Sequence, residues 1–511
     1  MEPRSSLQSV YQTSLALHTD LYQLTMAYGY WKTKRHNTES GFHLFFRKHP
    51  FGGGFTVACG LQNAMDFIQG FRFSSEDLDY LATLTGRDGA RLFEDAFLEH
   101  LRDMRITCDV DAVPEGSVIF PQEPLLRVRG PIDQCQLLET PLLNLVNFQT
   151  LVATKAARMT LATRGEPVVE FGLRRAQGID GGLSASRAAF IGGCTATSNV
   201  LAGRHYGIPV KGTHAHSWVM SFDEEEEAFL AYAKAMPNNC VFLVDTYDTL
   251  AGVKKAIRAG QWLRDNGHEM IGIRLDSGDL AYLSTEARRL LDEAGFDKAV
   301  IVASNDLDEH IITSLKEQGC TIALWGVGTR LATAYDQPSL GGVYKLAAVR
   351  HEGETTWRHR IKLAEQRAKI TTPGVLQVRR FRDANGYLGD AIWDEATGIA
   401  EDCTIVDPMD ETRRKTVPAD TEGVDLLQPI FRKGTLMYES PPLTAMQQRV
   451  RDELSRFHAG VKRFVNPHEY PVGLEADLHA LRTQLILRAR SLEGSDSQSP
   501  DSTGFGREMT S

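Results

Sequence analysis

Between residues 167 and 330 the sequence repeats one pattern, a short apolar run, then a polar cluster, then a segment with helical spacing. The apolar runs are PVVEF, IPVKG, CVFLV, MIGIRL, AVIVA and TIALW, and the clusters that follow them include THAHS, DTYD, DSGD, SNDLD and GVGT. The runs have the length of buried strands, and several of the intervening segments end at glycine, as helices commonly do. Strands that alternate with helices predict a parallel sheet covered by helices on both faces.

This pattern predicts that residues 142–345 form an irregular (β/α) barrel, with the working residues at the carboxyl ends of the strands. An open doubly wound sheet, which also binds ligands at that edge, is the alternative. No GxGxxG motif opens a helix here, which argues against a dinucleotide-binding sheet. The expected fold class is therefore α/β, with a second, smaller α+β domain formed partly from N-terminal segments.

The rest of the chain has a different texture. Residues 15–141 mix helical and strand-like stretches and are predicted to form the N-terminal α+β domain. Residues 346–430 contain short strands and turns that return to the small domain, and residues 431–490 are predicted to be helical. The two ends, residues 1–14 and 491–511, are polar and are predicted to be flexible or disordered.

Composition narrows the possible functions. The formal net charge of −10 argues against a nucleic-acid partner, because phosphate backbones are bound by basic surfaces. No apolar run is long enough to cross a bilayer and the N-terminus lacks an apolar signal core, so we expect a cytoplasmic protein with no membrane partner. The seven cysteines lie far apart without a CxxC pair, which indicates reduced thiols rather than a disulfide framework or a zinc site.

The stretch GTHAHSWVMSF carries His214 and His216. On a strand these side chains would point to the same face, a geometry that can bind a metal, so a metal-dependent hydrolase is one hypothesis. Such an enzyme needs further ligands at later strand ends. Those ends offer Asp245, Asp276 and Ser304 but no histidine, which weakens the metal hypothesis. A hydrogen-bonded structural histidine is the plainer alternative.

The segment RLDSGDL places Arg274, Asp276 and Asp279 directly after an apolar run. A helix cap would account for one aspartate and for Ser277. It would not account for an arginine at the buried end of a strand. Asp245 in VDTYD has the same two interpretations, a helix cap or a catalytic carboxylate.

Other strand ends carry groups that suit anions. Gly326 and Gly328 in GVGT, together with Ser304, offer small residues and free backbone N–H groups to a phosphate. Arg174 and Arg175 follow VVEFGL and are candidate clamps for a carboxylate or a phosphate. The whole set predicts a phosphorylated small-molecule substrate rather than a redox cofactor or a nucleic acid.

From about Thr19 to Arg488 the chain resembles the nicotinate phosphoribosyltransferase family. The resemblance rests on many blocks in the same order, among them TDLYQLTMAYGYW, FFRKHPFGG, VPEGS, EFGLRRAQGIDGG, TSNVLAG, GTHAHSWVMSF, VDTYDT, RLDSGDL, SNDLDE, GVGT and QPSLGGVYKL. It implies a homodimer with an active site shared between subunits. The implied reaction joins nicotinate to 5-phosphoribosyl 1-diphosphate, giving nicotinate mononucleotide and diphosphate, the first step of NAD synthesis from nicotinate. It is coupled to ATP hydrolysis through a transient phosphohistidine and requires Mg²⁺.

The resemblance also implies the roles of individual residues. The phosphorylated histidine is His216, and Asp245 is the carboxylate that pairs with it. Such a carboxylate would keep one ring nitrogen as N–H, so that the other can attack a phosphoryl group. Asp276 is expected to act at the ribose or its metal, and no protein ligand of the metal is assigned. His214 is expected to make ordinary contacts and to have no chemical role.

The remaining matched positions imply substrate contacts. Tyr22 would stack on nicotinate from across the dimer interface. Thr213, Arg274 and Arg174 would form the nicotinate pocket, where guanidinium groups pair with the ring carboxylate. The residues implied for 5-phosphoribosyl 1-diphosphate are Thr329, Gly326, Gly328 and Ser304.

Nicotinamide phosphoribosyltransferase is the nearest rival, because it shares the fold and the histidine. That family has an aspartate in its GTDTVAG segment, which accepts a hydrogen bond from the amide of nicotinamide. The equivalent segment here is TSNVLAG, with Ser198 and Asn199 instead. An aspartate would repel a carboxylate, so its absence favours the acid substrate. A catalytically silent homologue is disfavoured by the presence of His216, Asp245 and Arg274.

Overall fold

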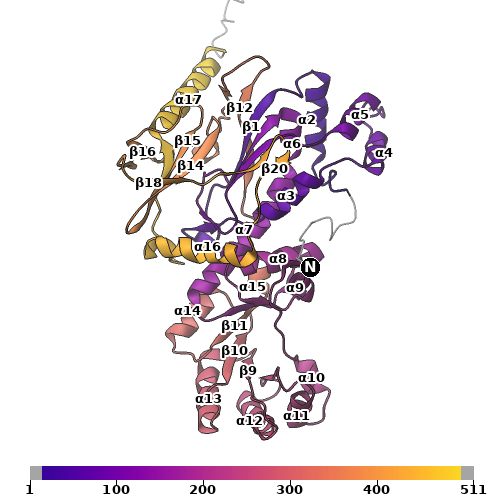
Figure 1. Ribbon diagram of the computed structural model, residues 1–511, viewed down its shortest axis with the longest axis vertical. Helices are drawn as coiled ribbons and strands as arrows, with labels where there is room; N and C mark the ends of the chain where they lie inside the picture. Colours follow the sequence, from indigo (N-terminus) through magenta and orange to yellow (C-terminus); the bar gives the residue numbers. More distant parts are fainter. Residues whose placement is uncertain (1–13, 497–511) are drawn as a thin grey trace, which may run out of the picture.

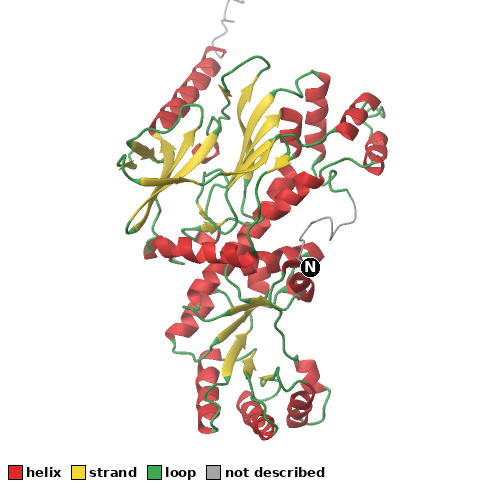
Figure 2. Cartoon of the chain, in the orientation of Figure 1, coloured by secondary structure: helices red, strands yellow, loops and turns green. Residues whose placement is uncertain are grey.

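The computed structural model describes residues 14–496, so the predicted flexible residues 1–13 and 497–511 lie outside it. The chain forms two bodies joined at a waist, and helix α7 (Glu139–Ala162) runs from one into the other (Figures 1 and 2). The lower body contains the parallel sheet, and the upper body contains two mainly antiparallel sheets. The site predicted from the sequence therefore belongs mainly to the lower body.

Six parallel strands form the sheet of the lower body, which confirms the α/β class. In spatial order they are β7 (Ala196–Thr197), β6 (Val168–Glu170), β11 (Leu324–Val327), β10 (Val300–Ser304), β9 (Gly272–Leu275) and β8 (Val241–Leu243). The apolar residues of the predicted runs supply the buried centre, for example Ile273, Ile301 and Trp325. Strand β11 begins three residues later than the run TIALW predicts, so Gly326 lies in the strand and not in the turn after it.

The strand order is the cyclic order of a barrel opened at one seam, between β7 and β8. The predicted strand in IPVKG is wrong, because this segment contributes only an isolated bridge from Val210 to Thr197 of β7. The segment after Val210 contacts β8 through the side chain of His214, whose Nε2 accepts a hydrogen bond from the Leu243 N–H at 3.3 Å. Among the described residues the backbone ladder does not close, and the barrel stays a prediction.

Helices follow most of these strands and cover the sheet. Helix α7, 24 residues long, packs against α8 and α14 below and against α3 above, so it connects the two bodies. The helices of the lower body are α8 (Gly178–Ile191), α9 (Val200–Tyr206), α10 (His216–Met220), α11 (Glu225–Ala235), α12 (Thr249–Asp265), α13 (Leu280–Glu293), α14 (Glu309–Glu317) and α15 (Thr329–Ala332), with the 3₁₀ turn η2 (Leu173–Arg175).

The sequence led us to expect that the second domain is smaller than the first. The structure differs, because the second domain holds two sheets. One has seven strands, in the order β13 (Arg358–His359), β12 (Val343–Arg350), β1 (Glu39–Phe45), β5 (Leu126–Pro131), β3 (Asp109–Ala112), β19 (Gln428–Arg432) and β20 (Thr435–Leu436). The other has six, in the order β17 (Arg414–Val417), β16 (Cys403–Val406), β21 (Val472–Glu475), β15 (Gly386–Asp394), β14 (Leu376–Asp383) and β18 (Glu422–Asp425). A short pair, β2 (Thr56–Val57) and β4 (Val118–Ile119), completes the strands.

The helices of the upper body surround these sheets (Figure 2). They are α2 (Leu21–Lys32), α3 (Leu61–Gly70), α4 (Ser75–Thr83), α5 (Asp95–Asp103), α6 (Ile132–Leu137), α16 (Leu443–Arg456) and α17 (Ala476–Asp496), with the 3₁₀ turns η1 (Pro50–Gly52), η3 (Arg367–Lys369) and η4 (Ala459–Lys462). Helix α17 continues into the first residues of the predicted C-terminal tail. Within residues 14–496 no helix combines the length and apolar composition that a bilayer span needs. All seven cysteines are free thiols.

Candidate active site

The carboxyl ends of β8 and β9 bring the predicted catalytic residues together. Nε2 of His216, the first residue of α10, lies 3.2 Å from Oδ1 of Asp245, which follows β8. The imidazole is 38% exposed, whereas the Asp245 side chain is 1% exposed. The pair therefore consists of a buried carboxylate behind an accessible ring, as a nucleophilic histidine requires.

Asp245 is fixed from its other side as well. Its Oδ2 accepts hydrogen bonds from the backbone N–H of Asp276 at 2.9 Å and from the hydroxyl of Ser277 at 2.6 Å. Both donors lie in the turn after β9. The carboxylate thus joins two strand ends and has little freedom to rotate away from His216.

Helix caps do not account for these aspartates. The N-caps of α12, α13 and α14 are Asp248, Asp279 and Asp308, whose carboxylates accept backbone N–H bonds in the first turn. In the first two units the aspartate three residues earlier, Asp245 or Asp276, is left for the site. The spacing is visible in the sequence as DTYD and DSGD, and it could have separated the two roles.

A cationic pocket lies beside the histidine. Nη1 of Arg274, on β9, donates to Oγ1 of Thr213 at 3.0 Å, while its Nε is buried without a partner in the described part of the chain. Burial lowers the pKa of Arg274 and the nearby cation of Arg174 lowers it further, against the opposing effect of Asp276 and Asp245. An anion would complete this arrangement, because it would pair with the unused Nε and offset the repulsion.

The predicted phosphate-site residues lie at the next strand ends. The Ser304 hydroxyl, at the end of β10, donates to Asp276. A side chain at Gly326 would meet the ring of Phe171 at 2.7 Å, so this glycine is explained by packing. Gly328 and Thr329 form the turn into α15. Their backbone positions suit a phosphate on the same edge of the sheet as His216.

His214 and His216 do not share a face, so the geometric basis of the metal hypothesis is wrong. Residues 211–215 are not a strand, and the ring of His214 packs against Tyr232 with centroids 4.9 Å apart. Burial lowers the pKa of His214 to about 4, so its Nε2 is an acceptor at neutral pH for the Leu243 N–H. The expectation that His214 makes ordinary contacts is confirmed.

Tyr22 is the predicted site residue that the single chain does not bring to this edge. It lies on α2 in the upper body, 50% exposed (Figure 1). Asp20 and Glu139 are its charged neighbours there, and burial, followed by these two carboxylates, raises the pKa of its hydroxyl.

One residue at the edge was missed by the sequence reasoning. Glu170, the last residue of β6, is 1% exposed and accepts three hydrogen bonds. The signal was present, since a glutamate interrupts the otherwise apolar run PVVEF. Buried carboxylates are uncommon unless the fold or the site uses them.

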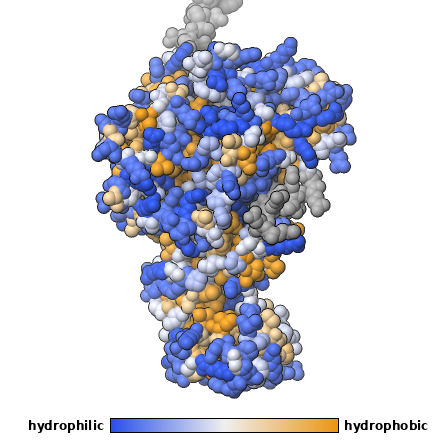
Figure 3. Space-filling model, viewed as in Figure 1, coloured by the Kyte–Doolittle hydropathy of each residue, from blue (hydrophilic) through white to orange (hydrophobic). Residues whose placement is uncertain are grey.

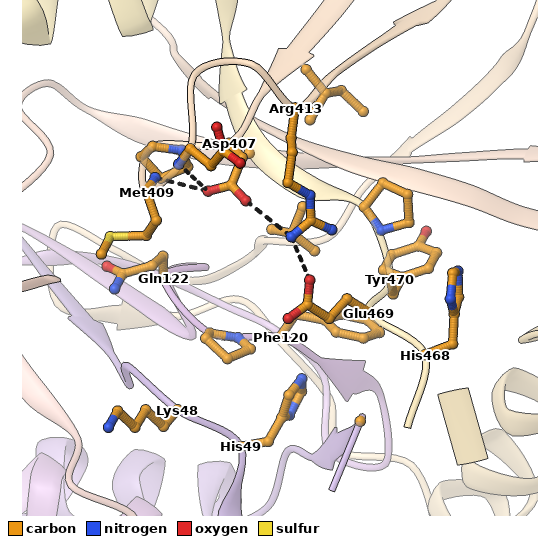
Figure 4. Close-up of a pocket in the computed structure, with 18 of the residues that line it drawn as sticks. Lys48, His49, Phe120, Gln122, Asp407, Met409, Arg413, His468, Glu469 and Tyr470 are labelled. Carbon is orange, nitrogen blue, oxygen red and sulfur yellow. Dashed lines mark hydrogen bonds and ion pairs between the residues drawn. The ribbon is translucent and has the colours of Figure 1, made fainter. Parts of the chain in front are cut away.

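A cavity of about 1080 Å³ lies elsewhere, in the upper body. Figure 4 shows that Arg413 spans its wall between Asp407 and Glu469, with Lys48 and His49 on the opposite side. None of the predicted site residues lines it. The candidate site is instead an open edge of the parallel sheet.

Family sequence models match three stretches of the chain. The nicotinate phosphoribosyltransferase (NAPRTase) N-terminal domain matches residues 17–147, the nicotinate phosphoribosyltransferase (NAPRTase) family matches residues 167–370, and the C-terminal domain of nicotinate phosphoribosyltransferase matches residues 377–482. The middle match contains every predicted site residue except Tyr22, which falls in the first.

Individual proteins agree with this. The chain is 44% identical over 483 residues to the nicotinate phosphoribosyltransferase of Bacillus subtilis (strain 168), covering 94% of this chain and 96% of that protein. It is 38% identical over 534 residues to the Caenorhabditis elegans protein of the same name, covering 92% and 93%. The crystal structure of human nicotinic acid phosphoribosyltransferase superposes with a TM-score of 0.78 at 35% identity, covering 92% of this chain and 100% of that chain. The chain belongs to the nicotinate phosphoribosyltransferase family.

Proposed function

We propose that this chain transfers the phosphoribosyl group of 5-phosphoribosyl 1-diphosphate to nicotinate, coupled to ATP hydrolysis through a phosphohistidine at His216. The products are nicotinate mononucleotide, diphosphate, ADP and phosphate. The observation that carries this proposal is the 3.2 Å contact between Nε2 of His216 and Asp245 at the edge of the parallel sheet. Membership of the family supports the choice of substrates.

The contact with Asp245 supports different tasks for the two nitrogens of His216. With its proton on Nε2, the ring is held by Asp245, and Nδ1 carries the lone pair. Nδ1 attacks the terminal phosphorus of ATP, an N–P bond forms, the P–O bond breaks, and ADP leaves. Asp245 stabilises the positive charge that develops on the ring, and water later cleaves the N–P bond to give phosphate.

Nicotinate would bind through its carboxylate to Arg274 and Arg174. The Nε of Arg274 is buried and unpaired in the described residues, and Thr213 fixes one end of the guanidinium. Asn199, in the segment where nicotinamide enzymes carry an aspartate, is a neutral amide that donates to Ser186 and caps α9. This segment therefore adds no charge that would repel a carboxylate. This favours nicotinate over nicotinamide.

Transfer of the phosphoribosyl group follows at the same edge. The C1–O bond to diphosphate breaks, and the ring nitrogen of nicotinate forms the new bond to C1. Asp276 would stabilise positive charge on the ribose in this step, because preorganised charge acts most strongly where charge develops. Ser304 donates to Asp276 and holds its orientation.

The donor set fits Mg²⁺ held mainly by substrate. Residues 14–496 contain no group of three or more His, Cys, Asp or Glu side chains that could hold a metal by themselves. Mg²⁺ in phosphoryl-transfer sites is commonly bound by one or two carboxylates and by substrate phosphates. Asp276 would be the protein ligand here, and the bound ion would offset charge on the diphosphate as it leaves.

We also propose that the site is shared between two copies of the chain. Apolar side chains near the strand ends are exposed, including Ile179 at 74% and Val200 at 70%. Figure 3 shows apolar surface at the waist, where α8 and α9 lie in Figure 1. A second copy could cover this surface and bring its own Tyr22 to the nicotinate pocket.

Two measurements test the proposal. Product formation is measured with nicotinate, nicotinamide and quinolinate side by side, and we expect nicotinate mononucleotide from nicotinate. Incubation with γ-labelled ATP should give a protein label that is labile in acid and stable in base, and ³¹P spectra should place it on Nδ1. His216→Ala should lose both the label and ATP coupling. A wild-type protein that makes no nicotinate mononucleotide would overturn the proposed reaction, and full coupling in His216→Ala would overturn the phosphohistidine.

A further inference from the structure

Glu170 lies at the centre of a buried hydrogen-bond network that the proposed chemistry does not use. Its Oε2 accepts from the Ser186 hydroxyl at 2.9 Å and from the Thr197 hydroxyl at 2.6 Å, and its Oε1 accepts from the N–H of Gly172. No lysine, arginine or histidine of residues 14–496 forms an ion pair with it. A buried carboxylate without a cation is costly, and here three donors compensate it.

The network connects two loops with separate tasks in the proposed reaction. Gly172 begins the turn η2 that carries Arg174. Thr197 and Ser186 hold Asn199 in turn, because Thr197 Oγ1 accepts from the Asn199 N–H at 3.0 Å and Ser186 Oγ accepts from its amide at 3.1 Å. One carboxylate thus fixes both the arginine turn and the loop that replaces the acidic segment of nicotinamide enzymes.

The same segment also touches the phosphate side of the edge. A side chain at Gly172 would meet Cβ of Ala332 at 2.4 Å and the carbonyl of Gly328 at 2.9 Å, so the turn sits tightly against α15. The Phe171 N–H donates to the carbonyl of Val327 at 2.6 Å. Strand β11, which leads to the proposed phosphate site, is also held by backbone hydrogen bonds to β6. A change in the side chain of Glu170 should therefore displace the turn that carries Arg174 more than it displaces the phosphate site.

We propose that Glu170 is a positioning residue for substrate recognition, which sets the distance between the Arg174 turn and the Thr197–Asn199 loop and so determines affinity and selectivity for a pyridine carboxylate. This inference rests on the proposed function. Glu170 does not touch the substrate and acts through Arg174 and Asn199.

The test is steady-state kinetics of the full-length protein, with nicotinate and 5-phosphoribosyl 1-diphosphate varied in turn. Glu170→Gln removes the charge and one acceptor while keeping the shape. Ser186→Ala removes one donor from the network. Ser184→Ala is the matched control, because it is the same substitution on the same helix, and Ser184 makes no side-chain hydrogen bond in the described residues.

We expect the KM for nicotinate to rise at least about tenfold in Glu170→Gln, because small misplacements of binding groups have effects of this size or larger. The KM for 5-phosphoribosyl 1-diphosphate should stay within about twofold of the wild-type value. The preference for nicotinate over nicotinamide should decrease, because this preference and the KM for nicotinate both depend on the position of the arginine turn. Ser186→Ala should show a smaller effect in the same direction, and Ser184→Ala none.

A purely structural role predicts a different result, namely a fall in kcat with both KM values and the selectivity unchanged. That result would overturn the inference. If Glu170→Gln does not fold, as judged by circular dichroism, the same comparison of KM values in Ser186→Ala and Thr197→Val tests the role of the Glu170 network. Wild-type protein without activity on nicotinate would instead refute the proposed function, and this inference with it.

Discussion

Arg274 uses one guanidinium nitrogen to bind Thr213 and leaves its Nε available for a ligand. Its guanidinium donates to Thr213 and faces a second cation, Arg174, while its Nε has no partner in the described residues. An unpaired buried donor is costly. Arg129 and Arg187 also have an unpaired Nε in the described residues, so the argument for Arg274 needs the neighbouring cation of Arg174 as well. The unpaired donor beside a second cation supports the proposal that a ligand carboxylate binds here.

At this scale we predict the result of replacing Arg274 by lysine. The charge is kept but the planar fork is lost, so the KM for nicotinate should rise about 10- to 100-fold, the range of one charge-assisted hydrogen bond. Arg264→Lys is the control, because Arg264 lies on α12 beside Glu269 and Phe296, outside the predicted site. A selective rise in the KM for 5-phosphoribosyl 1-diphosphate would place Arg274 at the phosphate instead.

At the scale of the element, the strand–turn–helix units divide their polar residues between folding and chemistry. In the units of β8 and β9 the later aspartate caps the helix and the earlier one lies in the site. The cap satisfies free N–H groups of the first turn, and the earlier residue lies where the strand ends and the backbone opens toward solvent. The same short segment therefore both ends a strand and supplies a functional group.

We predict opposite phenotypes for the two aspartates of DTYD. Asp248→Ala should lower the free energy of unfolding by about 1 kcal/mol through loss of the cap, with the phosphohistidine label kept. Asp245→Asn should lose most of the label with little change in stability, because the amide no longer favours the required proton position on His216. Denaturant titration and labelling with γ-labelled ATP measure the two effects. A label lost in Asp248→Ala at full stability would contradict this division of roles.

At the scale of the whole molecule, two bodies carry different parts of the predicted site. Tyr22 belongs to the upper body, whereas His216 and Arg274 lie on the sheet of the lower body. If the site is shared, each of two complementary variants can supply what the other lacks.

We predict that Tyr22→Ala and His216→Ala are each nearly inactive but regain activity when mixed and allowed to exchange subunits. Half of the dimers then contain one intact site, so about a quarter of the wild-type activity should return. Sedimentation measures the oligomeric state of each variant as a control. No recovery from dimers that do exchange would show that Tyr22 serves its own chain or none.

Buried neutral histidines make the molecule sensitive to acid. Burial lowers the pKa of His43 to about 3, of His49 to about 3 and of His214 to about 4, from an ordinary value of 6.5. His43 and His214 both use Nε2 to accept a backbone N–H from a neighbouring strand, Leu376 and Leu243 respectively. Protonation would abolish these acceptors.

The sign of the pH effect follows from these values. Between pH 6.5 and about 4 the unfolded chain binds more protons at His214 than the folded chain. The contribution of the neutral histidine to the free energy of unfolding is therefore fully present above pH 6.5 and is lost as the pH falls toward 4. We predict a melting temperature that drops between pH 7 and pH 5. His214→Gln, which keeps an acceptor that does not titrate, should reduce the slope. An unchanged slope would show that His214 does not contribute to it.

Much of the lower body could be predicted from the sequence because its signals are local. Apolar runs between helical segments predicted a parallel α/β sheet, and the end of the strand in RLDSGDL marked the place of Asp276. The family followed from the order of many motifs and was confirmed by the comparisons. The strand in IPVKG and the shared face of the two histidines were wrong, because both depend on backbone pairing with distant segments.

The sequence by itself determined the α/β class, the family and the residue types available at the strand ends, since these depend on short-range pattern and composition. Only the tertiary structure decided that Asp245 faces His216, that His214 joins a loop to β8, and that Glu170 links two loops. These are contacts between residues far apart in the chain, and no local spacing records them. They arise because buried polar groups must find partners wherever the fold brings donors and acceptors together.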